Sequence, residues 1–76
     1  MTQEQWKSIF ADNLISILHD RGMTQRQLAM DSGISPAMIS EYIHKIRMPG
    51  LAAAINMAYA LDVDICELVD FDERIE

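Results

Sequence analysis

Apolar residues recur at steps of three and four along most of the chain, which is the period of an amphipathic helix. The first run consists of Trp6, Ile9, Phe10, Leu14, Ile17 and Leu18. Arg21 and Gly22 follow this run, and glycine readily takes the left-handed conformation that ends a helix. The pattern therefore predicts a first helix that ends at Arg21-Gly22.

A second, shorter helix is predicted from a polar start signal and a glycine stop. Thr24 followed by Gln27 has the spacing of a capping box, so this helix begins at about Gln25. Gly33 ends it after about two turns. The helix carries the small residue Ala29, at a position where a neighbouring helix can approach closely.

The third predicted helix follows after only three residues. Ser35 can cap it, and Pro36 stands at its first position, where the missing N–H is not needed. Its buried side is predicted to consist of Ile39, Tyr42 and Ile43. Two short helices joined by so short a turn must cross at a steep angle, which is the arrangement of a helix-turn-helix.

The last part of the chain predicts two more helices. Pro49-Gly50 breaks the pattern, and a fourth apolar stripe then runs through Leu51, Ala54, Ile55, Ala58 and Leu61. Asp64 with Glu67 is a second capping box and opens a short fifth helix through Ile65, Leu68 and Val69. No segment alternates with period two, so the sequence predicts an all-α fold with five helices.

The block from residue 25 to residue 42 resembles the Cro and lambda-repressor type of helix-turn-helix family. The resemblance covers Phe10 to Val69 without a gap and is carried by Thr24-Gln25, Leu28-Ala29, Gly33, Ser35, Ile39-Ser40, Arg47, Pro49, Ala58, Leu61, Val63 and Leu68. It implies a compact, lambda-repressor-like domain that docks the second helix of the motif in the major groove of DNA, usually as a dimer. Many such proteins are repressors from phages and mobile elements. We expect residues 1–76 to form one such domain, with an acidic segment at about residues 70–76.

Four positions depart from the pattern of that family. Lys45 stands where the family usually has glycine, and the sequence allows either a longer third helix or a left-handed Lys45. Ile43 replaces a common glutamate, and Ser32 replaces a residue that is often apolar. Asp62 replaces a frequent glycine or asparagine after the fourth helix.

Charge is distributed unevenly along the chain, whose formal net charge is −6. Residues 20–48 hold four bases and three acids, whereas residues 62–76 hold seven acids and one base. The acidity is thus a property of the C-terminal part. The middle of the chain remains able to face a phosphate backbone.

The resemblance implies which side chains would contact DNA. The base-reading candidates are Pro36, Ala37, Ser40 and Glu41. Ala37 can pack on a thymine methyl group, and Glu41 can accept a hydrogen bond from cytosine N4, although it is equally interpretable as a solvated helix residue. The phosphate-contact candidates are Gln25, Arg26, His44, Lys45 and Arg47.

Several classes of function find no support in the sequence. It contains no Ser/His/Asp set, no cysteine with a base at hand and no Gly-rich phosphate loop, so we expect neither an enzyme nor a small-molecule substrate. Cys66 is the single cysteine, and His44 lacks partners at metal spacing, so no metal or other cofactor is predicted. No leader pattern and no membrane-length apolar run appear, which is typical of a cytoplasmic protein.

Apolar residues near the C-terminus predict self-association. The interface candidates are Leu68, Val69, Phe71 and Ile75, and specificity on DNA usually needs two such domains on a palindrome. Two functions remain open. One is a sequence-specific regulator that binds double-stranded DNA as a homodimer. The other is a protein-interaction module of the antirepressor or antitoxin kind, which the overall acidity favours.

Overall fold

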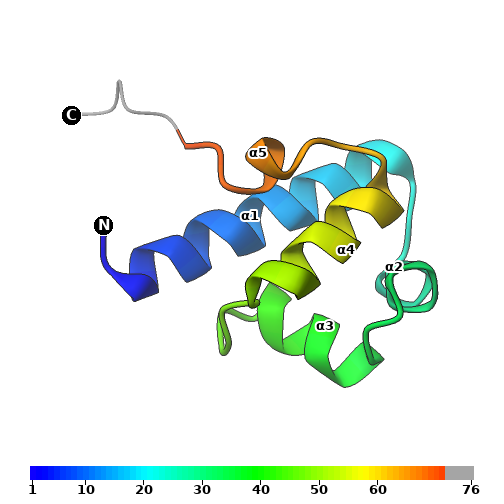
Figure 1. Ribbon diagram of the computed structural model, residues 1–76, viewed down its shortest axis with the longest axis horizontal. Coiled ribbons are helices and arrows are strands. Elements are labelled where there is room, and N and C mark those ends of the chain that lie inside the picture. The colour runs from blue at the N-terminus through cyan, green and yellow to red at the C-terminus, as the bar shows by residue number, and fades with distance from the viewer. Residues whose placement is uncertain (72–76) are drawn as a thin grey trace.

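Five α-helices form the computed structural model, which describes residues 1–71 (Figure 1). They are α1 (Gln3–Arg21), α2 (Gln25–Ser32), α3 (Pro36–Ile43), α4 (Leu51–Leu61) and α5 (Ile65–Leu68). Helices α2 and α3 are the predicted helix-turn-helix. The all-α, five-helix fold expected from the sequence is confirmed.

Side-chain caps begin both helices of the motif, although only one of the two hydrogen bonds of the predicted Thr24–Gln27 capping box is present among the described residues. The Thr24 hydroxyl accepts a hydrogen bond from the Gln27 N–H at 3.0 Å, and the Ser35 hydroxyl accepts one from the Met38 N–H at 3.2 Å. Gly33 ends α2 with a φ of 74°, a left-handed conformation in which glycine avoids the cost of a Cβ. These contacts determine where the turn between α2 and α3 lies.

The core lies where all five helices meet. Its largest fully buried side chains are Phe10, Leu14, Leu28, Ile39, Met57, Leu61 and Leu68. Ile39, Tyr42 and Ile43 are buried as predicted, and the Tyr42 ring meets the Phe10 ring edge to face at 6.4 Å. Three buried residues on one side of α3 hold this short helix against the core and turn its other side outward.

The segment after α5 is tied to α1. The Asn13 side-chain amide donates to the backbone carbonyls of Leu68 at 3.1 Å and Asp70 at 2.7 Å. The Trp6 and Phe71 rings pack edge to face, with their centroids 5.8 Å apart. Among residues 1–71, no helix is long and apolar enough to cross a membrane.

These contacts correct part of the predicted dimer interface. Leu68 is fully buried in the core of its own chain, so its side chain is not available to a second copy. Phe71 retains 37% exposure but already packs on Trp6, and Val69 is half-buried. Ile75 lies outside the described residues. Leu68 and Phe71 therefore pack within their own chain and help to close the domain on itself.

Candidate nucleic-acid interface

The outward side of α3 carries all four of the predicted base-reading residues. Pro36 and Ala37 are exposed in its first turn, and Ser40 and Glu41 lie half-buried one turn later. Ala37 and Glu41, four residues apart, lie on the side of the helix away from the buried residues Ile39, Tyr42 and Ile43, whereas Pro36 and Ser40 lie at the edge of that side nearer Ile43. The major groove of DNA is wide enough to admit an α-helix. The first two turns of α3 can therefore face the base edges in such a groove.

The first turn of α2 adds a polar pair beside the motif. Gln25 and Arg26 directly follow the Thr24 cap and are both exposed. Within residues 1–71, Arg26 forms no ion pair. Its guanidinium is therefore a charged hydrogen-bond donor that no carboxylate among residues 1–71 neutralises.

Arg47, in the loop after α3, is bound to Glu41. Its Nε donates to Glu41 Oε1 at 2.7 Å, and the side chain of Arg47 is 56% exposed. This hydrogen bond, together with the negative charge of Glu41, raises the pKa of Arg47 above its ordinary value. The backbone agrees with the pairing, because the Ile46 N–H donates to the Glu41 carbonyl at 2.9 Å. The loop thus folds back over the end of α3.

Lys45 takes the left-handed conformation, with a φ of 65°, and α3 ends before it. The sequence left open whether the third helix continues through Lys45 or Lys45 is left-handed, and the structure shows the left-handed conformation. The Lys45 ammonium lies 3.3 Å from Asp12 Oδ1 on α1. His44 precedes it, and its Nδ1 lies 2.8 Å from the Ser40 carbonyl oxygen. Lys45 and His44 are both exposed beside α3.

Asp12 is the residue of this region that the sequence did not reveal. It lies on α1, 33 positions before Lys45, and no motif connects the two. The Glu41–Arg47 pair was equally hidden, since each residue was assigned to DNA separately. Two of the three Lys and Arg residues expected to face phosphate therefore have a carboxylate partner within the protein.

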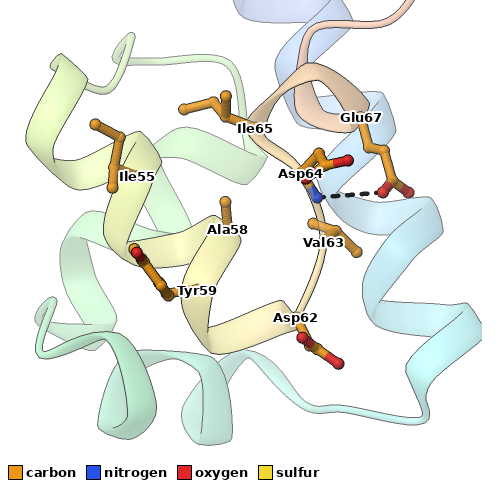
Figure 2. Close-up of a pocket in the computed structure, with 8 residues that line it drawn as sticks. All are labelled: Ile55, Ala58, Tyr59, Asp62, Val63, Asp64, Ile65 and Glu67. Carbon is orange, nitrogen blue, oxygen red and sulfur yellow. Dashed lines mark hydrogen bonds between the residues drawn. The ribbon is translucent and has the colours of Figure 1, made fainter.

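A groove of about 490 Å³ lies between α4 and α5 on another part of the surface. Figure 2 shows the side chains that line it, drawn from α4, from α5 and from the connection between them. Ile55, Ala58, Val63 and Ile65 provide apolar walls. Asp62, Asp64 and Glu67 add carboxylates, and Glu67 accepts a hydrogen bond from the Asp64 N–H at 3.2 Å.

The groove continues into an apolar stripe along α4. Leu51 and Tyr59 are 75% and 83% exposed, and Ile55 between them is 38% exposed. Their spacing of four residues puts them on one face of the helix. Large apolar side chains that stand together in solvent often mark a surface of association.

The two regions differ in charge. Residues 48–71 contain four acids and no lysine or arginine. In Figure 1, α5 and α3 lie on opposite sides of α4. The acidic groove and the surroundings of α3, where Lys45 and Arg47 balance Asp12 and Glu41 and Arg26 adds a positive charge, therefore belong to different parts of the molecule.

Solved structures of other proteins share this fold. The restriction-modification controller protein C.AhdI from Aeromonas hydrophila is 27% identical, with a TM-score of 0.76 over 79% of this chain and 91% of that chain. An HTH_3 family transcriptional regulator from Vibrio cholerae has a TM-score of 0.85 at 24% identity, over 88% of this chain and 38% of that chain. The hypothetical transcription factor NHTF from Neisseria has a TM-score of 0.82 at 23% identity, over 91% of this chain and 79% of that chain. No match was found among curated proteins.

The helix-turn-helix family model HTH_3 matches residues 17–68, which span the end of α1 and all of α2 to α5. These 52 residues are more than two thirds of the 76-residue chain. The chain therefore belongs to the HTH_3 family, the Cro and lambda-repressor type of helix-turn-helix DNA-binding transcription regulator.

Proposed function

We propose that this protein regulates transcription by inserting α3 into the major groove of a specific DNA sequence. The observation that carries the proposal is the exposed side of α3 with Arg26, Lys45 and Arg47 around it, in a molecule that has seven of its twelve acids at residues 62–76. Base contacts would come from α3, and phosphate contacts from the start of α2 and the loop after α3. The role we favour is repression on phage or other mobile DNA, as in many proteins that the sequence resembles.

Salt dependence tests the proposal. A duplex is first selected from a random oligonucleotide pool, and its affinity is then measured at several salt concentrations. Each phosphate contact contributes about 0.9 to the slope of log affinity against log salt concentration. We expect Lys45→Gln with Arg47→Gln to weaken binding to every sequence and to flatten the slope by nearly two units, at about 0.9 each.

Lys7→Gln is the matched control, because it removes the same kind of charge from α1, where Lys7 pairs with Glu4. It should change the slope little. Affinity that survives the double substitution would place the DNA surface elsewhere. Absence of salt-dependent duplex binding at micromolar concentration would overturn the proposal and favour the protein-interaction module.

We further propose that the protein acts as a homodimer, with the second copy seated on α4 rather than on α5. Among the C-terminal residues first expected at the interface, Leu68 is buried and Phe71 packs on Trp6, whereas Leu51, Ile55 and Tyr59 on α4 remain exposed. A two-fold dimer uses the same surface on both copies, so the stripe of one α4 can meet the groove beside the other. Two α3 helices then read the two halves of a palindrome.

A further inference from the structure

We propose that Glu41 is a positioning residue for Arg47 and does not read a base. The proposal rests on the DNA-binding function, and it assigns Glu41 a different task from the one expected of an acid on α3. Its basis is the contact between Arg47 Nε and Glu41 Oε1 at 2.7 Å.

Glu41 holds the loop in two ways. Its carboxylate binds the Arg47 side chain, and its carbonyl accepts hydrogen bonds from the N–H groups of Ile46 at 2.9 Å and Arg47 at 3.4 Å. The side chain of Glu41 is only 34% exposed, although it lies on the outward side of α3. It therefore lies against the loop rather than extending freely toward a base.

The geometry of the guanidinium makes this pair useful toward phosphate. Arginine has five N–H donors, and Glu41 occupies the one on Nε. Four donors on the two Nη atoms remain, in the forked arrangement that suits a phosphate. A long side chain that is already oriented loses less conformational freedom on binding.

The pair also explains how an acid is tolerated on this helix. A lone carboxylate on the DNA-facing side of α3 would repel the phosphate backbone. Bound to Arg47, the carboxylate is neutralised locally, and the net effect of the pair on DNA depends on the donors that it orients. Glu41 thus acts on DNA only through Arg47.

Two substitutions at Glu41 separate this role from its rivals. Glu41→Ala removes the acceptor, whereas Glu41→Gln keeps a carbonyl oxygen that can still accept from Arg47 Nε. We expect Glu41→Ala to weaken binding of the selected duplex about three- to tenfold, the size of one hydrogen bond, with Glu41→Gln in between. The loss should be the same on every member of a panel of single-base variants of that duplex.

A double-mutant cycle with Arg47→Ala provides the decisive comparison. If Glu41 acts through Arg47, Glu41→Ala should have no further effect on affinity in the Arg47→Ala background. An effect confined to one base position would show direct reading. Tighter binding by both Glu41 variants would show plain repulsion. An unchanged loss in the Arg47→Ala background would show an effect through α3 itself. Each of these three results overturns the proposal.

A measurement without DNA distinguishes failure of this proposal from failure of the proposed function. In the free protein, exchange of the Arg47 Nε proton with solvent is followed by NMR. We expect slow exchange in the wild type and in Glu41→Gln, and faster exchange in Glu41→Ala. Fast exchange in the wild type would overturn the pairing, whatever the protein binds. A protein with the slow proton but no affinity for duplex would refute the DNA-binding function, and the positioning role with it.

Discussion

The backbone of Lys45 lies in the left-handed region, with a φ of 65°. This conformation destabilises the folded state by about 1–2 kcal/mol for an L-amino acid and by almost nothing for glycine. The related family usually has glycine here, so this chain keeps a lysine at some cost in stability. The ammonium thereby gained lies next to α3 and pairs with Asp12.

Comparison of Lys45→Gly with Lys45→Ala should reveal that cost. Both variants lose the exposed ion pair with Asp12, so its contribution cancels. Only glycine relieves the strain. Part of the resulting gain in stability is lost, because glycine makes the unfolded chain more flexible. We expect Lys45→Gly to be more stable than Lys45→Ala by about 0.5–1 kcal/mol in urea unfolding. Equal stability, or a more stable alanine variant, would contradict the assignment of strain.

Helices were the part of the structure that could be read from the sequence. Periodicity and caps predicted the five helices, because those signals lie within a few residues of each other. The start of α1 was missed. Thr2 and Gln5 exchange hydrogen bonds of 3.1 and 2.7 Å in a capping box that begins α1 at Gln3, before the apolar pattern starts.

Contacts between distant elements could not be read in this way. Asn13 is a polar residue in a helix, and its bonds to Leu68 and Asp70 span 55 and 57 positions. Nothing near Asn13 in the sequence indicates these partners. The error over Leu68 has the same origin, because its burial depends on the packing of α5 against α1 and α4.

Asn13→Ala should detach the segment after α5 from α1. It removes two hydrogen bonds of about 0.5–1.5 kcal/mol each, partly offset by the better helix propensity of alanine. Asn56→Ala on the exposed side of α4 brings the same propensity gain and is the matched control. We expect lower stability and faster amide exchange in α5 for Asn13→Ala alone. Equal behaviour of the two variants would mean that the tie contributes nothing.

The proposed dimer would be a property of the whole molecule, and its response to salt should be distinctive. Asp62, Asp64 and Glu67 border the groove, so two copies that meet there bring like charges together. Salt screens this repulsion while the apolar contact persists. We expect dimerisation at tens of micromolar, tightened when salt rises from about 0.05 to 0.5 M, whereas DNA binding weakens.

Sedimentation equilibrium measures the dimer directly. Leu51→Ser with Tyr59→Ser should raise the dissociation constant at least about tenfold, since both side chains are largely exposed in one chain and buried only on association. Met30→Ser is the control, because Met30 is as exposed as Leu51 but lies on α2. A protein that stays monomeric both free and on DNA would refute the dimer.

The separation of charge between α3 and the α4–α5 region gives the molecule an electric dipole. Near DNA, the end with Arg26 is drawn inward and the end with Asp62, Asp64 and Glu67 is pushed away. The protein would therefore rotate as it approaches and arrive with α3 foremost more often than chance allows. A net charge of −6 slows every approach, but the dipole makes a larger share of the encounters productive. An acidic protein can in this way meet DNA less often and still bind in the correct orientation in a larger fraction of its encounters.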